Sequence, residues 1–171
     1  LNTDYPKHKL EIIVVDNAST DGSQEIVARE YPNIILIRNR KNMGFCMGNN
    51  VGISKASGDL IILLNNDTIV KRNWIIEILK KANNPKIGII GCKLLYPSGK
   101  IIQSCGCKEK FIGYWEHIAA GLRTEEFDFE NEVEVDYVCG AAIAIKKEVF
   151  KKVGLLDPIF WAYVEEVDLC Y

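Results

Sequence analysis

The sequence predicts an α/β fold with a mostly parallel central sheet and helices on both faces. The aliphatic run at residues 60–64 has no polar side, which is typical of a strand buried on both faces of a parallel sheet. A second run at residues 10–15 is rich in β-branched side chains, and segments of helical period separate such runs. We expect residues 1–171 to form one domain, because this length suits a single hydrophobic core.

The overall composition excludes several classes of protein. Apolar residues make up 48% of the chain and charged residues 26%, as in ordinary globular domains. The net charge of −2 gives no general attraction for nucleic acid, so no nucleic-acid partner is expected. No apolar run approaches the length of a membrane span. The six cysteines form no CxxC pair, which favours reduced thiols in a cytoplasmic protein over a zinc site.

The first part of the chain predicts two strands with a helix between them. The strand at residues 10–15 ends at Asp16, which places this carboxylate at the edge of the sheet. A helix is predicted from the capping residues 19–21 to about residue 31, where Pro32 ends it. The second strand is predicted at residues 34–37.

A basic, amide-rich loop at residues 38–45 leads into a second helix, which is predicted to run to Ala56. The loop is either a solvated turn or a phosphate contact at the start of that helix. The chain lacks the GxxxxGK[ST] spacing of a P-loop. It also lacks a GxGxxG fingerprint after the strand at residues 10–15, which disfavours a dinucleotide-dependent oxidoreductase.

The strand at residues 60–64 is followed directly by Asn65, Asn66 and Asp67. Open α/β sheets bind ligands beyond the carboxyl ends of their strands. Oxygen donors in a row suit a hard divalent cation, and such a cation suits a diphosphate. The alternative is a polar turn that only ends the strand.

The second half predicts a helix at residues 74–82 and a hairpin over residues 87–102 with its turn at Pro97. Residues 108–132 are predicted to be an irregular, mobile excursion. A strand follows within residues 135–145, and the small residues in its middle suggest close approach by a ligand or another backbone.

A last helix opens with Glu165, Glu166 and Asp168, directly after an aromatic segment at residues 160–163. Crowded carboxylates raise at least one pKa, which favours a general base or a metal site. The alternative is an acidic first turn that interacts with the helix macrodipole. The aromatic segment would form a wall for a sugar ring.

Taken in order, four segments resemble family 2 glycosyltransferases, most of all their rhamnosyltransferase-like branch. Residues 13–23 resemble the family's VVDN-S-TDGS segment, and residues 42–53 its NxGF…NNxGI segment. Residues 58–67 resemble the strand leading to the DXD motif, and residues 139–169 the acceptor-side and ED segments. The resemblance implies a GT-A (Rossmann-like) nucleotide-diphospho-sugar transferase fold. The family's usual first strand and helix are missing before residue 13, so the domain is expected to be incomplete at both ends.

On the donor side, the resemblance implies that Asp16 accepts a hydrogen bond from the nucleotide base. It makes Asp67 the ligand of Mg²⁺ or Mn²⁺ on the donor diphosphate, with Asn65 in place of the first DXD aspartate. Further substrate-binding residues would be Asn17, Asn42, Gly44, Asn50, Asn65, Asn66, Gly140, Ala141 and Trp161.

On the acceptor side, the resemblance makes Glu166 the catalytic base, with Glu165 as a second candidate. Asp168 would orient the base or the start of the helix.

The implied function is inverting transfer of a sugar from dTDP-rhamnose or a UDP-sugar to a hydroxyl of a glycan or lipid-linked acceptor. A carboxylate would take the proton of the hydroxyl, and a cation would stabilise the departing diphosphate. We expect a cytoplasmic protein of cell-envelope polysaccharide biosynthesis, whose full-length parent associates with the inner face of the membrane. The alternative is a non-catalytic nucleotide- or carbohydrate-binding module derived from such a transferase.

Overall fold

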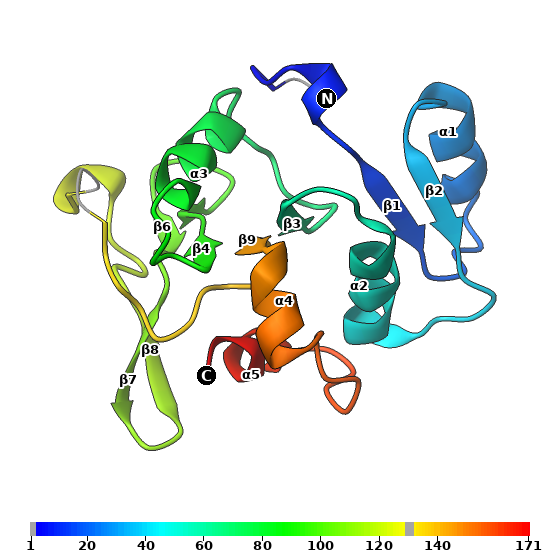
Figure 1. Cartoon of the computed structure of the whole chain (residues 1–171). Helices are drawn as coiled ribbons and strands as arrows, with labels where there is room; N and C mark the ends of the chain where they lie inside the picture. Colours follow the sequence, from blue (N-terminus) through cyan, green and yellow to red (C-terminus); the bar gives the residue numbers. More distant parts are fainter. Residues whose placement is uncertain (1–2, 129–131) are drawn as a thin grey trace.

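The computed structural model describes residues 3–128 and 132–171 as an α/β structure (Figure 1). Its strands are β1 (Ile13–Asp16), β2 (Ile35–Arg38), β3 (Leu60–Leu64), β4 (Ile89–Gly91), β5 (Leu94–Leu95), β6 (Ile102–Ser104), β7 (Cys107–Phe111), β8 (Tyr114–His117) and β9 (Ala142–Lys146). Its α-helices are α1 (Ser23–Glu30), α2 (Gly44–Lys55), α3 (Trp74–Ala82), α4 (Lys147–Val153) and α5 (Glu165–Cys170), and its 3-10 helices are η1 (Lys7–Lys9) and η2 (Thr124–Glu126).

The strand arrangement is mixed, so the prediction of a mostly parallel sheet is wrong. β1 and β2 are parallel, with Ile13 opposite Ile35. β9, however, pairs antiparallel with β3 on one side and with β4 on the other. A continuous aliphatic run indicates that a strand is buried on both faces but does not fix its direction. β9 follows the excursion through β5–β8 and enters the sheet from the end opposite to β3.

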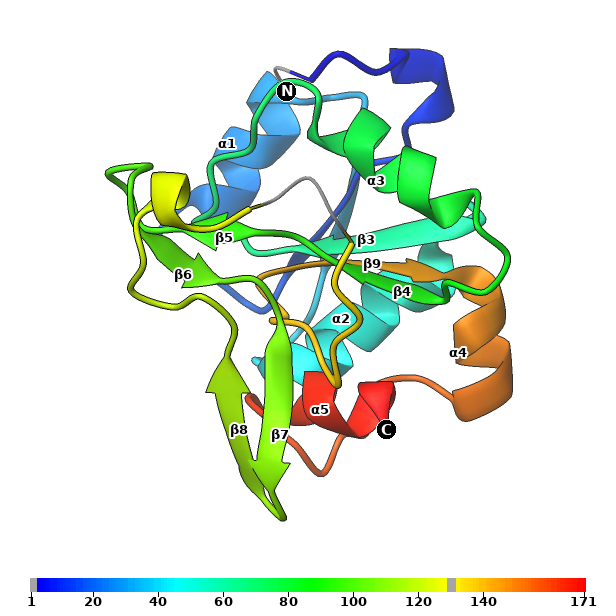
Figure 2. The same cartoon turned by 90° about the vertical axis from the view of Figure 1, so that its left-hand side faces the viewer.

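Helices cover both faces of the β3–β9–β4 group, as the sequence predicts. Figure 2 shows α3 above these strands and α2 below them. On the α2 side, Cys46 and Ile53 pack in one hydrophobic cluster with Ile143 and Ile145 of β9. Because side chains alternate along a strand, the small residues Ala142 and Ala144 of β9 face the other side. The central strands are therefore buried from both directions, and their ends remain available to form a site.

Residues 107–117 form a β-hairpin where the sequence predicts an irregular excursion. β7 and β8 pair from Cys107 opposite His117 to Phe111 opposite Tyr114. The strands are mostly charged and polar, so the alternation of apolar side chains that indicates a strand is absent. Residues 129–131 of the same predicted excursion lie outside the described residues.

The other elements follow the predictions more closely. α3 has the predicted bounds, and β5 pairs antiparallel with β6 as the predicted hairpin requires. Within the two described ranges, no helix is both long enough and apolar enough to cross a bilayer.

Candidate active site

Asp16 ends β1 and is almost completely buried there. Its carboxylate accepts a hydrogen bond from the main-chain amide of Ser19, with Oδ2 at 3.1 Å. The turn between the two residues passes through Ala18, whose φ of 63° lies in the left-handed region. The strand end and the turn therefore fix the position of the carboxylate. A carboxylate held in this way is suited to accept a hydrogen bond from a bound ligand.

Two asparagine side chains fix the start of α2 against the end of β1. Asn17 Nδ2 donates to the carbonyl oxygen of Gly44 at 2.9 Å, and Asn17 Oδ1 accepts from Asn39 Nδ2 at 2.8 Å. Asn42 Oδ1 accepts from the main-chain amide of Gly44 at 2.9 Å. The structure thus brings the predicted residues Asn17, Asn42 and Gly44 together, and it uses both asparagine side chains to shape the loop.

Gly44 also contacts the loop before α5. It has φ +77°, and a Cβ at this position would lie 2.8 Å from Trp161 Cδ2 and 2.8 Å from the Trp161 carbonyl oxygen. The Trp161 indole itself remains 60% exposed. A side chain on residue 44 would displace the tryptophan, so this position requires glycine.

Asn50 joins α2 to the segment after α4. Its Nδ2 donates to the carbonyl oxygen of Leu156 at 2.7 Å, and its Oδ1 accepts from the amide of Leu156 at 3.1 Å. The residue is buried. The structure gives Asn50 a clear role in joining two segments, and its role as a substrate ligand stays a prediction.

Gly140 and Ala141 lie between the Asn65–Asp67 turn and the glutamates of α5. The main-chain amide of Asn65 donates to the carbonyl oxygen of Ala141 at 2.9 Å. A Cβ on Gly140 would lie 3.6 Å from Glu165 Oε1 and 3.8 Å from Glu166 Cβ. The backbone of residues 140 and 141 therefore contacts both the predicted donor side and the predicted base.

Glu165 and Glu166 hold carboxyl oxygens in the interior. Glu165 is only 5% exposed, and Glu166 is half-buried. Among the described residues, the Oε2 atoms of both are buried without a hydrogen-bond partner. Burial raises the pKa of the Glu165 carboxyl, and the neighbouring Glu166 carboxylate adds to this increase. Buried acids without partners are costly, and their retention in a fold is typical of a functional site.

The two glutamates line a small cavity with Phe45 of α2, Leu63 of β3 and Leu156. Its volume of about 10 Å³ has room for at most one water molecule. In this arrangement the carboxyl groups are shielded from bulk water, which strengthens their electrostatic interactions.

Asp168 lies elsewhere. Its exposed side chain lines a separate open groove together with Asn50, Val51 and Pro158. Residues two positions apart on a helix point about 200° apart, so Asp168 and Glu166 face different sides of α5. The structure therefore does not place Asp168 in the cavity of the two glutamates, and its predicted orienting role remains a proposal.

Asp67 is exposed in the turn after β3, next to the amides of Asn65 and Asn66. Within the described part of the chain, no group of three or more His, Cys, Asp or Glu side chains could hold an ion by itself. One carboxylate with neighbouring amide oxygens fits a cation that takes its other ligands from a diphosphate and water, as Mg²⁺ commonly does.

A family comparison agrees with the motifs. The model of glycosyl transferase family 2 matches residues 1–154. The chain belongs to glycosyl transferase family 2. This confirms the family predicted from the four segments.

Two relatives of this family 2 chain have informative names. The O-antigen biosynthesis protein RfbC of Myxococcus xanthus is 27% identical over 98% of this chain and 14% of its own length. The N-acetylglucosaminyl-diphospho-decaprenol L-rhamnosyltransferase of Mycobacterium tuberculosis is 24% identical over 94% of this chain and 59% of its own length. The chain therefore spans less than two thirds of either relative.

The fold of the family 2 chain is similar to that of solved transferases. The mannosyltransferase PcManGT from Pyrobaculum calidifontis, in complex with GDP-Man and Mn²⁺, superposes with a TM-score of 0.66 at 21% identity. The likeness covers 98% of this chain and 43% of the mannosyltransferase. It confirms the predicted GT-A transferase fold.

Two titratable residues outside the predicted motifs, Lys93 and Tyr137, have shifted pKa values. Lys93 follows Cys92, whose amide donates to the carbonyl oxygen of Ala142. Burial and the charge of Lys71 lower the pKa of Lys93. Burial also raises the pKa of Tyr137, and the negative charge of Glu166 adds to this increase. The local sequence around Tyr137 does not indicate that it interacts with Glu166, because the two residues are far apart along the chain.

Proposed function

We propose that this family 2 chain forms the catalytic part of an inverting glycosyltransferase. The sugar would move from a nucleoside diphosphate donor to a hydroxyl of a glycan or lipid-linked acceptor. The observation that carries the proposal is the position of Gly140 and Ala141. Ala141 is hydrogen-bonded to the turn that contains Asp67, and Gly140 lies against Glu165 and Glu166. A donor at the turn and an acceptor at α5 would thus meet across two residues of backbone.

Glu166 is the better candidate for the base. A base must be ionised and must reach the acceptor hydroxyl. Glu165 is the more buried of the two, and burial favours its protonated form. Glu166 is only half-buried and lines the same cavity. In this pair, Glu165 would be protonated, which removes the repulsion between the two carboxyl groups. Glu166 would take the proton of the acceptor hydroxyl. Glu165 remains the second candidate.

Asp67 would hold Mg²⁺ or Mn²⁺ at the donor diphosphate, with the amides of Asn65 and Asn66 beside it. Such an ion, when bound, supplies positive charge to the departing diphosphate. Asp16 would accept a hydrogen bond from the nucleotide base, and the exposed indole of Trp161 would support the acceptor sugar.

The donor proposed is dTDP-rhamnose or a UDP-sugar, which the motifs suggest. The name of the mycobacterial relative supports a rhamnosyl donor and a lipid-linked acceptor. A lipid-linked acceptor in turn supports peripheral association with the inner face of a membrane, in a cytoplasmic enzyme of polysaccharide biosynthesis.

The test is turnover of a donor panel with a lipid-linked glycan acceptor, with and without Mn²⁺. We expect transfer with inversion at the anomeric carbon, and loss of transfer in Glu166→Gln. The matched control is Glu148→Gln, an exposed acid in α4.

The alternative, a non-catalytic binding module, has one observation in its favour: Asp67 is the only carboxylate of the turn after β3. It predicts donor binding by calorimetry without transfer to any acceptor.

A further inference from the structure

The β7–β8 hairpin ends in an apolar tip that is exposed to solvent. Phe111 is 67% exposed, Ile112 98% and Tyr114 53%. The rings of Phe111 and Tyr114 stack with their centroids 4.9 Å apart. Figures 1 and 2 both show the hairpin projecting from the body of the structure, with its tip on the side away from α3. Large apolar side chains grouped at the end of a projecting element indicate a contact surface.

The two lysines of the hairpin are already in ion pairs. Lys110 Nζ lies 2.7 Å from Glu116 Oε2, and Lys108 Nζ lies 3.2 Å from Asp136 Oδ1. A surface that binds nucleic acid or an acidic protein would keep its lysines available. An apolar and aromatic tip with neutralised flanks instead matches the interfacial layer of a lipid bilayer, where amphipathic rings are enriched. Three side chains are also far too few for a stable protein interface, which needs roughly 800 Å² from each partner.

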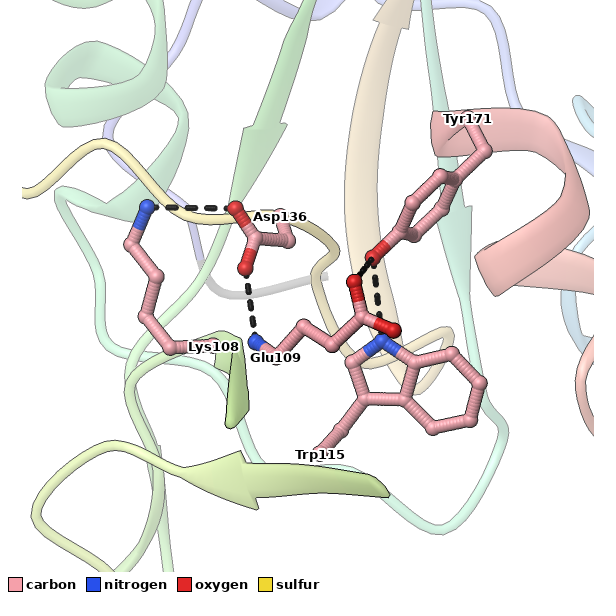
Figure 3. Close-up of polar contacts among 5 residues, drawn as sticks. All are labelled: Lys108, Glu109, Trp115, Asp136 and Tyr171. Carbon is pink, nitrogen blue, oxygen red and sulfur yellow. Dashed lines mark hydrogen bonds and ion pairs between the residues drawn. The ribbon is translucent and has the colours of Figure 1, made fainter. Parts of the chain in front are cut away.

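The middle of the hairpin, where Glu109 lies opposite Trp115, is fixed to the end of α5 (Figure 3). Trp115 Nε1 donates to the hydroxyl of Tyr171 at 3.1 Å, and this hydroxyl donates to Glu109 Oε2 at 3.2 Å. The main-chain amide of Glu109 in turn donates to Asp136 Oδ2 at 2.7 Å. Tyr171 directly follows α5, which carries Glu165 at its other end. A surface that holds the tip would therefore also fix the distance of the two glutamates from that surface.

We propose that Phe111, Ile112 and Tyr114 insert into the headgroup region of a lipid bilayer and so present α5 to acceptors at the membrane surface. The inference rests on the proposed peripheral membrane association and names the surface responsible for it. Because the lysines of the hairpin are paired, binding needs no anionic lipid and depends little on salt.

The experiment measures co-sedimentation of the 171-residue chain with phosphatidylcholine vesicles. Replacing two large apolar side chains with serine, in the double variant Phe111→Ser/Ile112→Ser, should weaken the partition coefficient about tenfold or more. The matched control is Ile69→Ser, which changes a fully exposed isoleucine between β3 and α3 and should leave binding unchanged. Adding 0.5 M salt or phosphatidylglycerol should change wild-type binding by no more than about twofold, because salt weakens only attraction between charges and the proposed contact is apolar.

A second measurement locates the hairpin tip relative to the bilayer while keeping its apolar character. In Ile112→Trp, brominated lipids should quench the added tryptophan fluorescence, and in Ile69→Trp they should not. Equal binding by the wild type and the double variant would overturn the hairpin assignment alone. Failure of the wild-type chain to sediment with the vesicles would overturn the membrane association of this chain as well. A dimer that forms through the tip in sedimentation equilibrium would overturn the assignment of the tip as the bilayer contact. Transfer to a water-soluble acceptor should be unchanged by the tip variants, so it tests the proposed function separately.

Discussion

The main-chain amide of Phe45 donates a hydrogen bond of 2.8 Å to the carbonyl oxygen of Trp161. This bond joins the first turn of α2, which Asn17 and Asn42 shape, to the loop that leads into α5. The predicted donor-side and acceptor-side motifs are therefore in direct contact. This contact depends on the absence of a side chain at Gly44.

Gly44→Ala should destabilise the fold and weaken donor binding. The positive φ costs an alanine about 1–2 kcal/mol, and overpacking against Trp161 adds roughly 1–3 kcal/mol. The control is Gly22→Ala, since Gly22 has φ +83° but nothing within 4 Å of an added Cβ. Urea unfolding of both variants separates the two costs. Equal losses of unfolding free energy would mean that the Trp161 contact contributes nothing.

Asn50→Ala should destabilise the chain by about 2–4 kcal/mol, because it leaves both the amide and the carbonyl of Leu156 without partners in the interior. Asn49→Ala is the control, since Asn49 makes a single side-chain hydrogen bond to Phe45 and should cost about 1 kcal/mol. Urea unfolding gives both values, and nucleotide titration of the folded variants tests the ligand role. A loss of nucleotide affinity in folded Asn50→Ala would assign that role after all.

Several features of the site could be predicted from sequence because local patterns determine them. The run at Leu60–Leu64 gave the correct strand, and its polar successors gave the turn with Asp67. The period of Trp74–Ala82 gave the bounds of α3. In these segments the hydrophobic pattern and the turn residues agree, which is where sequence reasoning works best.

The remaining features depend on contacts between distant segments. The sequence Ala142–Lys146 does not indicate that β9 is antiparallel. A strand that is buried on both faces is apolar whichever way it runs in the sheet. The β7 strand has charged residues at three of its five positions, and cross-strand ion pairs such as Lys110–Glu116 take the place of an apolar face. The acids at 165, 166 and 168 lie within four residues of the sequence, yet only Glu165 and Glu166 line the cavity.

Asp67→Asn should remove most of the Mn²⁺-dependent increase in donor affinity. The substitution keeps the size of the side chain but removes the only carboxylate of the turn, and a hard cation binds a neutral amide much more weakly. Asp59→Asn is the control, since it changes an exposed carboxylate just before the same strand. Calorimetry with donor and metal measures the difference. Unchanged metal-dependent affinity in Asp67→Asn would reject this residue as the ligand.

Glu165→Gln should stabilise the fold at neutral pH. The pKa of Glu165 is higher in the folded than in the unfolded chain, so the folded state binds the proton more tightly. The contribution of Glu165 to the free energy of unfolding of the wild type is therefore fully present below its pKa in the unfolded state. This contribution is lost as the pH rises through its pKa in the folded state. Glutamine cannot ionise, so the gain in Tm over wild type should grow as the pH rises above the unfolded-state pKa and should level off above the folded-state pKa. Thermal unfolding across this range tests it, and a gain that is the same at every pH would contradict the raised pKa.

Glu166→Gln should reduce kcat by roughly 10²–10⁴-fold, the usual contribution of a general base. Glutamine keeps the size and shape of the side chain but cannot accept the proton of the acceptor hydroxyl. Donor affinity should change little, because the donor is proposed to bind at the Asp67 turn, on the far side of Gly140 and Ala141. Glu165→Gln is the comparison, since the two side chains lie against the same glycine and differ mainly in burial. If Glu165 only holds a proton, its glutamine variant should retain most of the turnover with saturating donor and acceptor. A loss confined to Glu165→Gln would move the base to the more buried carboxylate, and normal turnover in both variants would leave the hydroxyl proton to a group other than these two glutamates.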